Sequence, residues 1–180
     1  MIKLIHPQKN GERGSTLLEM MVVTLIIAMM SSISIPMIQD SLAARQLEWT
    51  ARSFIEHAHF ARQQALYLCE PTQIAPRSRN DWNSGWVIES SVSKKAWFMQ
   101  GPIDPIYFQD GGKQFSGPNA AQKGIIFNAA GAAKTAQGGF VANRLILRHR
   151  RHSELERHLI LGSGGRWRIC DPQSDSKACQ

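Results

Sequence analysis

Residues 13–36 read RGSTLLEMMVVTLIIAMMSSISIP, and this stretch decides what kind of fold the rest of the chain can adopt. The run from Ser15 to Ile35 would form a helix about 31 Å long at 1.5 Å per residue, which matches the hydrocarbon core of a bilayer. Basic residues precede the run, as is typical of a cytoplasmic amino terminus. A secretory signal places its small-residue cleavage site after the apolar run, whereas here the small residue, Gly14, precedes it. We therefore expect the apolar segment to remain on the mature protein as an anchor.

A single acidic residue, Glu19, lies near the start of this apolar segment. An unpaired charge in apolar surroundings costs several kcal/mol, so the carboxylate needs a positive partner or access to polar lipid head groups. Its position alone fits both alternatives equally well.

The pair Arg13-Gly14, followed by an apolar stretch that contains Glu19, resembles the cleavage motif of type IV prepilins and type II secretion pseudopilins. The resemblance covers a leader, residues 1–14, and a transmembrane and assembly segment, residues 15–36. It implies that the prepilin peptidase, a membrane aspartyl protease, cuts between Gly14 and Ser15 and methylates the new amino group of Ser15. The family usually has phenylalanine where this chain has Ser15. The resemblance also implies that Glu19 neutralises the amino group of a neighbouring subunit during assembly.

The helical pattern continues beyond the anchor. Pro36 should bend the helix or remove one hydrogen bond. Apolar or small residues then recur at alternating intervals of four and three residues from Leu47 to Leu68, which marks one face of a helix. This spacing predicts an amphipathic helix over about residues 37–68. Pro71, Pro76 and the polar run 77–83 are expected to end it.

Short β-prone runs bounded by turn residues follow the helix. They lie at residues 86–88, 97–99, 106–108, 125–127, 140–149, 158–161 and 166–170. The order predicts an α+β fold in which a long amino-terminal helix, half transmembrane and half amphipathic, packs against an antiparallel β-sheet over about 84–170. Residues 37–180 would form the globular domain. The order of NDWNSGWVI, IIFNAAG and LILGSGGRWRIC is similar to that in the FimT/GspH group of minor pilins and pseudopilins.

Three cysteines, Cys69, Cys170 and Cys179, bear on the compartment. Cys170 and Cys179 close a short loop whose Asp, Pro and Ser residues favour a turn. In an oxidising compartment these two would pair and leave Cys69 over. Three free thiols, or a bond that involves Cys69, are the alternatives.

No motif predicts an enzyme or a cofactor. The sequence has no HExxH, no GxSxG and no phosphate-binding Gly-Lys-Ser/Thr loop. His149, His152 and His158 lie near one another in a basic loop, but no carboxylate or cysteine pattern accompanies them. We therefore predict no metal site.

Positive charge gathers in the last third of the chain, whose overall net charge is +7. Only Glu154 and Glu156 lie among the arginines of this region, which are Arg144, Arg148, Arg150, Arg151, Arg157, Arg166 and Arg168. Arginine pairs with phosphate in a fork and stacks on bases. In a strand, Arg166 and Arg168 would face one side and Trp167 the other. Trp167 could then stack on bases or pack into the core.

The stretch Gly165-Arg166-Trp167-Arg168 is similar to the Gly-Arg-x-Arg motif through which competence-linked FimT-type minor pilins bind DNA. The resemblance implies that Gly165, Arg166 and Arg168 form a DNA-binding site. The further candidates are Arg148, Arg150 and Arg151. Two alternatives remain: a basic edge strand that blocks sheet-to-sheet pairing, and a contact with acidic neighbours at a pilus tip.

The family resemblance implies a subunit held in the bacterial inner membrane by a single span, with its globular domain in the periplasm. It would then assemble with other major and minor pilins or pseudopilins into a pilus or pseudopilus. The leading prediction is non-specific DNA binding for uptake in natural transformation. The alternative is a pilus-tip or priming subunit, or a type II secretion pseudopilin, that binds no DNA.

Overall fold

The computed structural model describes residues 16–78, 81–109, 124–134, 139, 143–162, 164–174, 177 and 179. The predicted cleavage and methylation site, Gly14 and Ser15, lies outside these residues. Two compact units make up the chain, Met1–Gln39 and Asp40–Gln180. The buried apolar residues of the described chain run from Ala43 to Cys179, so the second unit contains the hydrophobic core.

Helix α1, Leu17–Leu68, begins with a capping arrangement. Thr16 precedes the helix, and its Oγ1 accepts a hydrogen bond of 3.3 Å from the backbone N–H of Glu19. Thr16 and Glu19 have the spacing of a capping box, and a carboxylate in the first turn also interacts favourably with the helix dipole. Glu19 therefore has a local role at the helix start in addition to any role in assembly.

The amino-terminal part of α1 is long and apolar enough to cross a membrane. Its large apolar side chains are exposed in the structure, from Leu17 to Ile38. Pro36 lies inside the helix. At the other end, the helix stops after Leu68, where Cys69 takes a positive φ of 53°.

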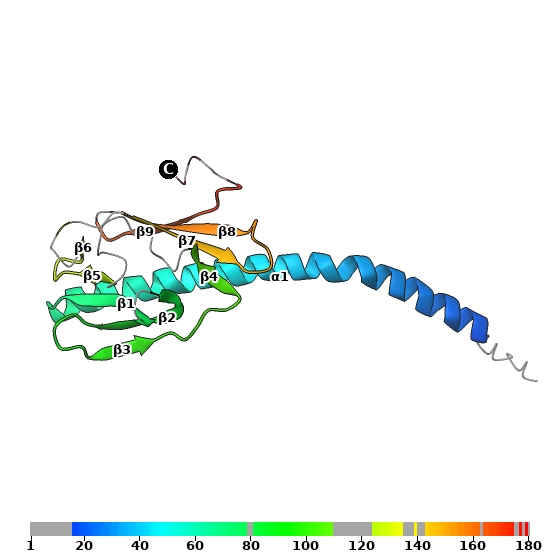
Figure 1. Cartoon of the computed structure of the whole chain (residues 1–180), viewed down its shortest axis with the longest axis horizontal. Helices are drawn as coiled ribbons and strands as arrows, with labels where there is room; N and C mark the ends of the chain where they lie inside the picture. Colours follow the sequence, from blue (N-terminus) through cyan, green and yellow to red (C-terminus); the bar gives the residue numbers. More distant parts are fainter. Residues whose placement is uncertain are drawn as a thin grey trace, which may run out of the picture. The chain divides into compact units, whose positions relative to one another are not determined.

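Among the described residues, nine strands form two antiparallel sheets that pack on the carboxy-terminal half of α1 (Figure 1). The five-stranded sheet has the order β3-β2-β1-β5-β6. Its strands are β1 (Thr72–Ser78), β2 (Asp81–Ser90), β3 (Ala96–Met99), β5 (Ile125–Phe127) and β6 (Ala133–Lys134). The four-stranded sheet has the order β4-β7-β8-β9. Its strands are β4 (Ile106–Phe108), β7 (Asn143–His149), β8 (Glu156–Leu161) and β9 (Trp167–Cys170).

The predicted α+β class and the long helix on antiparallel strands are confirmed, but two details of the prediction were wrong. The strands form two sheets rather than one, and strand structure begins at Thr72 rather than near residue 84. Pro76 lies in β1 opposite Trp86 of β2, whereas β5 pairs only with Thr72–Ile74 on the other side. The missing N–H of Pro76 therefore interrupts no ladder on the β5 side.

Phe54 of α1 joins the helix to both sheets. Its ring lies 5.6 and 5.1 Å from the rings of Trp82 and Trp86 on β2, 5.4 Å from Phe108 on β4, and 5.4 Å from Trp167 on β9. Small residues let both sheets approach the helix along the same face, namely Ala43, Ala51, Ala58, Ala61 and Ala65. The helix thus forms the centre of the core, with one aromatic anchor that contacts three strands.

Candidate nucleic-acid interface

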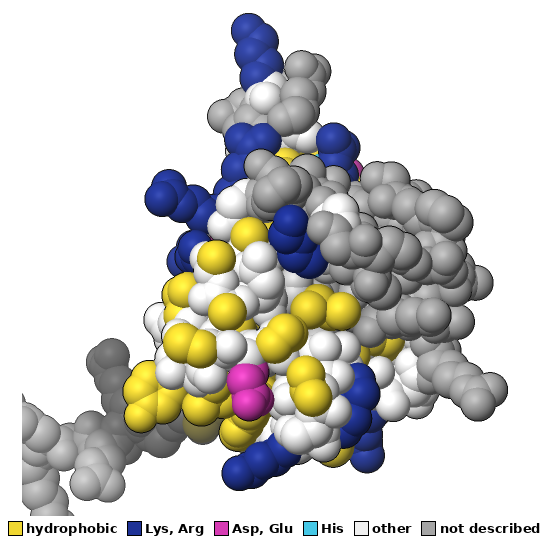
Figure 2. Space-filling model, turned by 90° about the vertical axis from the view of Figure 1, so that its left-hand side faces the viewer, with side chains coloured by type: hydrophobic (Ala, Val, Ile, Leu, Met, Phe, Trp, Pro, Cys, Tyr) yellow, Lys and Arg dark blue, Asp and Glu magenta, His cyan; other side chains and the backbone are white. Residues whose placement is uncertain are grey.

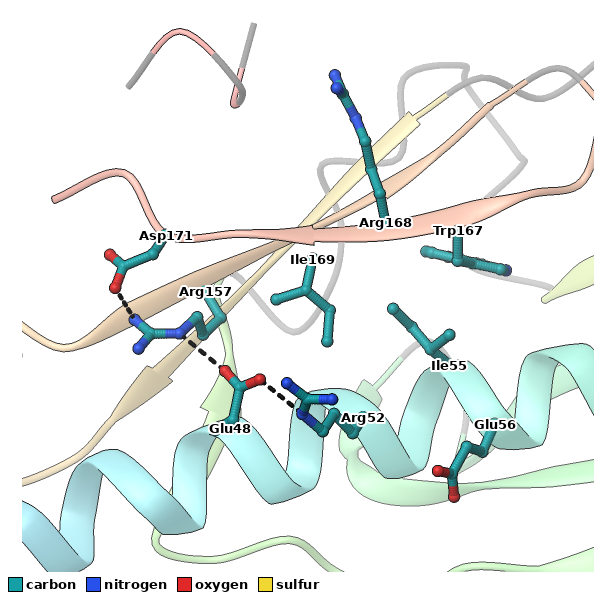
Figure 3. A pocket seen from close by; sticks show the side chains of 9 residues that line it. All are labelled: Glu48, Arg52, Ile55, Glu56, Arg157, Trp167, Arg168, Ile169 and Asp171. Atoms are coloured by element: carbon teal, nitrogen blue, oxygen red, sulfur yellow. Dashed lines mark hydrogen bonds and ion pairs between the residues drawn. The ribbon is translucent and has the colours of Figure 1, made fainter. Parts of the chain in front are cut away.

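Strand β9 separates the arginine and the tryptophan of the predicted site onto opposite faces. Arg168 is exposed and points away from α1, whereas Trp167 points toward the helix (Figure 3). Trp167 is only 9% exposed and packs edge-on against Phe54. Of the two alternatives for Trp167, core packing is the correct one. Arg166 is exposed and directly precedes the strand.

The pairing of the strands brings Arg144 to the same face as Arg168. Arg168 is the cross-strand partner of Ile160, and Ile160 is the partner of Arg144. Directly opposed residues of neighbouring strands point to the same side, so the two exposed arginines lie two strands apart, at about 10 Å between backbones. We call Arg144, Arg166 and Arg168 the β9 arginine surface. The strand register that brings Arg144 to the face of Arg168 cannot be read from the sequence.

Arg148, Arg150 and Arg151 lie at the opposite end of the four-stranded sheet. Arg148 is four residues along β7 from Arg144, about 13 Å at 3.3 Å per residue. It donates two hydrogen bonds to Glu156, of 3.0 and 2.7 Å. Arg150 forms an ion pair of 2.7 Å with Asp104 and lies 5.7 Å from the centre of the Tyr107 ring. The predicted site is therefore divided into two groups.

Arg157 faces the helix rather than solvent (Figure 3). It pairs with Glu48 of α1 at 3.1 Å and with Asp171 at 2.9 Å, and its side chain is 16% exposed. Both acids lie outside the stretch 144–168, Glu48 far away on α1 and Asp171 just beyond β9, so the region is less positive than a count over that stretch suggests. Figure 2 shows a face of the molecule on which Lys and Arg side chains gather in the upper part and acidic side chains are few.

Gly165 contributes backbone geometry to the motif. It is buried, its φ is +74°, and a Cβ atom there would lie 2.7 Å from the carbonyl oxygen of Gly131. The same oxygen accepts a hydrogen bond of 2.7 Å from Nε of Arg62 on α1. Gly165 also closes a turn by donating its N–H to the carbonyl oxygen of Gly162 at 2.9 Å. We conclude that this glycine positions the arginines that follow it.

A disulfide joins Cys170 and Cys179, with 5.6 Å between their Cα atoms. This is the predicted pairing, and Cys69 is a free, exposed thiol. The bond links the end of β9 to the carboxy-terminal segment. It therefore supports the strand that carries Arg168.

The three histidines considered as a metal group do not converge. His149 is buried on the helix-facing side of β7, like Leu145 and Leu147, whereas His158 of β8 faces the other side. The rings of His149 and His152 lie 5.1 Å apart. Nδ1 of His152 lies 3.3 Å from Asp40 and 3.4 Å from Glu154, so acids surround this histidine.

Residues 9–35 match the family model described as the prokaryotic N-terminal methylation motif. No curated protein sequence matches the chain. One crystal structure of the type IV minor pilin FimU from Pseudomonas aeruginosa is similar with a TM-score of 0.55, at 14% identity over 73% of this chain and 92% of that chain. A second crystal form of FimU gives 0.53, at 15% identity over 72% and 95%. The minor pseudopilin EpsH from the Type 2 Secretion System of Vibrio cholerae gives 0.49, at 11% identity over 71% and 98%.

The likeness to FimU shows a type IV pilin fold. The motif lies at the amino-terminal end, and the fold extends over most of the chain. Together they support the sequence prediction of a type IV minor pilin or pseudopilin.

Proposed function

We propose that this chain is a minor pilin or minor pseudopilin that is processed at Gly14–Ser15, held in the inner membrane and then assembled with other pilins. The methylation motif over residues 9–35 and the pilin fold support this proposal. The apolar part of α1 supplies the single span, and the globular domain lies in the periplasm. Glu19 neutralises the methylated amino group of Ser15 in a neighbouring subunit, because a carboxylate in an apolar filament core requires a positive partner.

Two substitutions test processing and assembly separately. Gly14→Ala blocks cleavage, so the full-length precursor accumulates in the membrane fraction on immunoblots. Glu19→Gln keeps the backbone hydrogen bond to Thr16 and removes the charge, so the protein is processed and membrane-bound but missing from sheared filaments. Normal maturation of Gly14→Ala would refute the cleavage site, and normal incorporation of Glu19→Gln would refute the assembly role.

We further propose that the β9 arginine surface binds the phosphates of DNA without sequence specificity, for uptake in natural transformation. The observation that carries this proposal is the row formed by Arg168 and Arg144 on one sheet face, with Arg166 beside it. The bidentate guanidinium group suits phosphate, and the disulfide and the Gly165 turn hold the strand in place. Because Trp167 is buried, the contacts are to the backbone of DNA rather than to stacked bases.

A gel-shift or fluorescence-anisotropy experiment with the fragment 40–180 tests the DNA proposal, since this fragment contains the described core. Wild-type fragment should shift DNA at low salt, and log Kd should rise linearly with log salt concentration. Arg166→Gln with Arg168→Gln should weaken binding by about 10-fold or more and reduce the salt slope by about two. Far-UV circular dichroism establishes that the variant is folded.

Arg45→Gln with Arg77→Gln is the matched control, because it removes the same charge from exposed sites on α1 and β1. It should retain most of the affinity. Replacement of Arg148 or Arg150 should weaken DNA binding less than replacement of Arg166 and Arg168, since these two arginines lie at the opposite end of the sheet. Equal losses of DNA affinity in the control and the test variant would mean that the effect depends only on net charge.

A wild-type fragment that leaves DNA unshifted at low salt would favour the second candidate, a tip or priming subunit or a type II secretion pseudopilin. The exposed arginines would then contact acidic neighbours in the filament. Deletion of the gene separates these two roles. Loss of an assembly subunit reduces piliation or secretion even in a strain that takes up no DNA.

A further inference from the structure

Three potential metal ligands converge on the face of the four-stranded sheet that points away from the helix. His158 of β8 and Cys170 of β9 are direct cross-strand partners, and Cys179 is brought beside Cys170 by the chain that follows β9. One ligand atom from each residue lies within 4.8 Å of the other two. The exposed fractions of His158, Cys170 and Cys179 are 7%, 6% and 5%. The fold thus gathers one imidazole and two sulfur atoms in a nearly dry site.

The imidazole of His158 is oriented in the manner of a metal ligand. Its Nε2 lies 3.3 Å from Oε1 of Glu156, and Oε2 of Glu156 accepts two hydrogen bonds from Arg148. Histidines that bind metal usually donate their second ring N–H to a carboxylate, which fixes the tautomer and the direction of the ring. The pair Arg148–Glu156, which weakens the case for Arg148 as a DNA contact, therefore holds His158 in place.

The second ring nitrogen of His158 is available for a ligand. Nδ1 is buried and has no hydrogen-bond partner among the described residues. With the proton on Nε2, Nδ1 keeps its lone pair, and a buried nitrogen in this condition is costly.

We propose that the reduced form of this chain binds one thiophilic divalent cation, represented by Zn²⁺, through Nδ1 of His158 and the thiolates of Cys170 and Cys179. Tetrahedral zinc with Zn–S of about 2.3 Å and Zn–N of about 2.0 Å separates its ligand atoms by roughly 3.5–3.8 Å, which lies within the 4.8 Å spanned by the ligand atoms of the cluster. The two sulfur atoms, bonded in the disulfide, move apart to this distance after reduction. Two thiolates balance the dication, so the site buries no net charge. Water takes the fourth position. The three ligands come from β8, β9 and the carboxy-terminal segment, so no local sequence spacing indicates them.

The disulfide and the metal site are two states of the same sulfur atoms. Zn²⁺ binding displaces the two thiol protons. In oxidation, Cys170 and Cys179 form their S–S bond by exchange with the disulfide of an oxidoreductase. The two electrons pass to that disulfide, its two sulfur atoms take up protons from solvent, and Zn²⁺ leaves unchanged. Before oxidation, the bound metal prevents Cys170 and Cys179 from forming a disulfide with Cys69, the exposed third thiol.

The test uses the full-length protein in detergent, reduced with a phosphine and freed of reductant without air. Zn²⁺ binding is measured by competition with a colorimetric chelator, and Co²⁺ binding by thiolate-to-cobalt charge-transfer absorption. Reduced protein should bind about one Zn²⁺ per chain and show the cobalt band, and the disulfide form should do neither. His158→Gln should weaken Zn²⁺ binding by about 10-fold or more. His152→Gln and Cys69→Ser, which leave the cluster intact, should bind as wild type does.

Glu156→Gln is the second variant, because it keeps all three ligands and changes the carboxylate that orients His158 and pairs with Arg148. It should weaken Zn²⁺ binding by about 10-fold as well. Circular dichroism identifies which variants are folded, and Zn²⁺ affinities are compared only among the folded variants. Equal Zn²⁺ affinity of wild type, His158→Gln and Glu156→Gln would mean that the two cysteine thiols chelate the metal with no contribution from His158. This result would overturn the proposal. Reduced wild type that binds no more Zn²⁺ than the disulfide form would overturn it equally.

Discussion

At the scale of single residues, the Gly-Arg-x-Arg motif combines two different functions. Gly165 is required by its positive φ and by the carbonyl oxygen of Gly131 beside it, whereas Arg166 and Arg168 project into solvent. The sequence shows the residue types of the motif, but it does not show that Gly165 lies against Gly131, in the turn between β5 and β6 of the other sheet. That contact joins residues 34 positions apart (165 − 131) and depends on how the two sheets pack.

Replacement of Gly165 by alanine should destabilise the fold. An L-residue at φ +74° is strained, and the new Cβ would lie 2.7 Å from a backbone oxygen, so we expect a loss of about 2 kcal/mol or more. Urea unfolding of the fragment 40–180 measures it. Gly164→Ala is the matched control, because a Cβ at Gly164 meets nothing within 4 Å. It should change stability by less than about 0.5 kcal/mol, and equal losses would contradict the strain argument.

Arg157 differs from the other arginines in the cluster because it contributes to stability rather than to the surface. Arg157→Gln would leave Glu48 and Asp171 without their shared partner in a part-buried site, so we expect a loss of about 2–3 kcal/mol. Arg150→Gln removes an ion pair whose side chains are 61% and 70% exposed, and it should cost less than about 1 kcal/mol. Thermal unfolding of both variants measures the two losses of stability. A larger loss in Arg150→Gln than in Arg157→Gln would show that Arg157 does not stabilise the fold in this way. The alternation Arg157, Leu159, Leu161 along β8 was the sequence signal that could have placed Arg157 on the inward face.

At the scale of elements, the strongest sequence patterns were the most informative. The alternating spacing from Leu47 to Leu68 predicted the amphipathic helix, and α1 ends at Leu68. Strand β1 was missed because Pro76 reads as a strand breaker, and its tolerance depends on where the neighbouring strand β5 stops. Strand β6, Ala133–Lys134, is too short to leave a period in the sequence. Local periodicity was readable, whereas pairing between distant strands was not.

The attachment of both sheets to α1 through Phe54 leads to a prediction at this scale. Phe54→Ala removes a fully buried ring that contacts β2, β4 and β9, so we expect a loss of about 3–5 kcal/mol. Phe60→Ala, six residues along the helix and only partly buried, should lose less than about 2 kcal/mol. Denaturant unfolding followed by tryptophan fluorescence measures both, because Phe54 contacts Trp82, Trp86 and Trp167. A smaller loss in Phe54→Ala than in Phe60→Ala would mean that the sheets do not depend on this anchor.

At the scale of the whole molecule, the sequence indicated the class of fold and the motif at each end, but not how charges are shared. Counted along the chain, seven arginines faced two acids. In the structure Glu48, Asp104 and Asp171, which lie outside the stretch 144–168 over which these charges were counted, pair with Arg157 and Arg150. The strand register places three exposed arginines, Arg144, Arg166 and Arg168, together at one end of a sheet, and these form the candidate site. A charge count thus identified the region, and only the register of the strands identified the surface.

Two histidines, the half-buried His57 and the buried His149, predict how the stability of the second unit depends on pH. Nδ1 of His57 accepts a hydrogen bond of 3.2 Å from Trp86, and Nδ1 of His149 accepts one of 3.2 Å from the backbone N–H of Arg151. Both interactions require an unprotonated nitrogen. Burial lowers the pKa of His57, with Glu56 partly opposing it. Burial, followed by the charges of His152 and Arg151, lowers the pKa of His149.

The unfolded chain protonates these two histidines near their ordinary pKa of about 6.5, whereas the folded state resists protonation to lower pH. The unfolded state therefore binds more protons as the pH falls below about 6.5, and the free energy of unfolding decreases there. Urea unfolding of the fragment 40–180 should give constant stability between about pH 7.5 and 8.5 and lower stability at about pH 5.5, above the range in which most carboxylates titrate. His57→Gln should unfold more easily at pH 7.5 but lose less stability on acidification. Stability that is unchanged or greater at pH 5.5 would contradict the neutral histidines on which both hydrogen bonds depend.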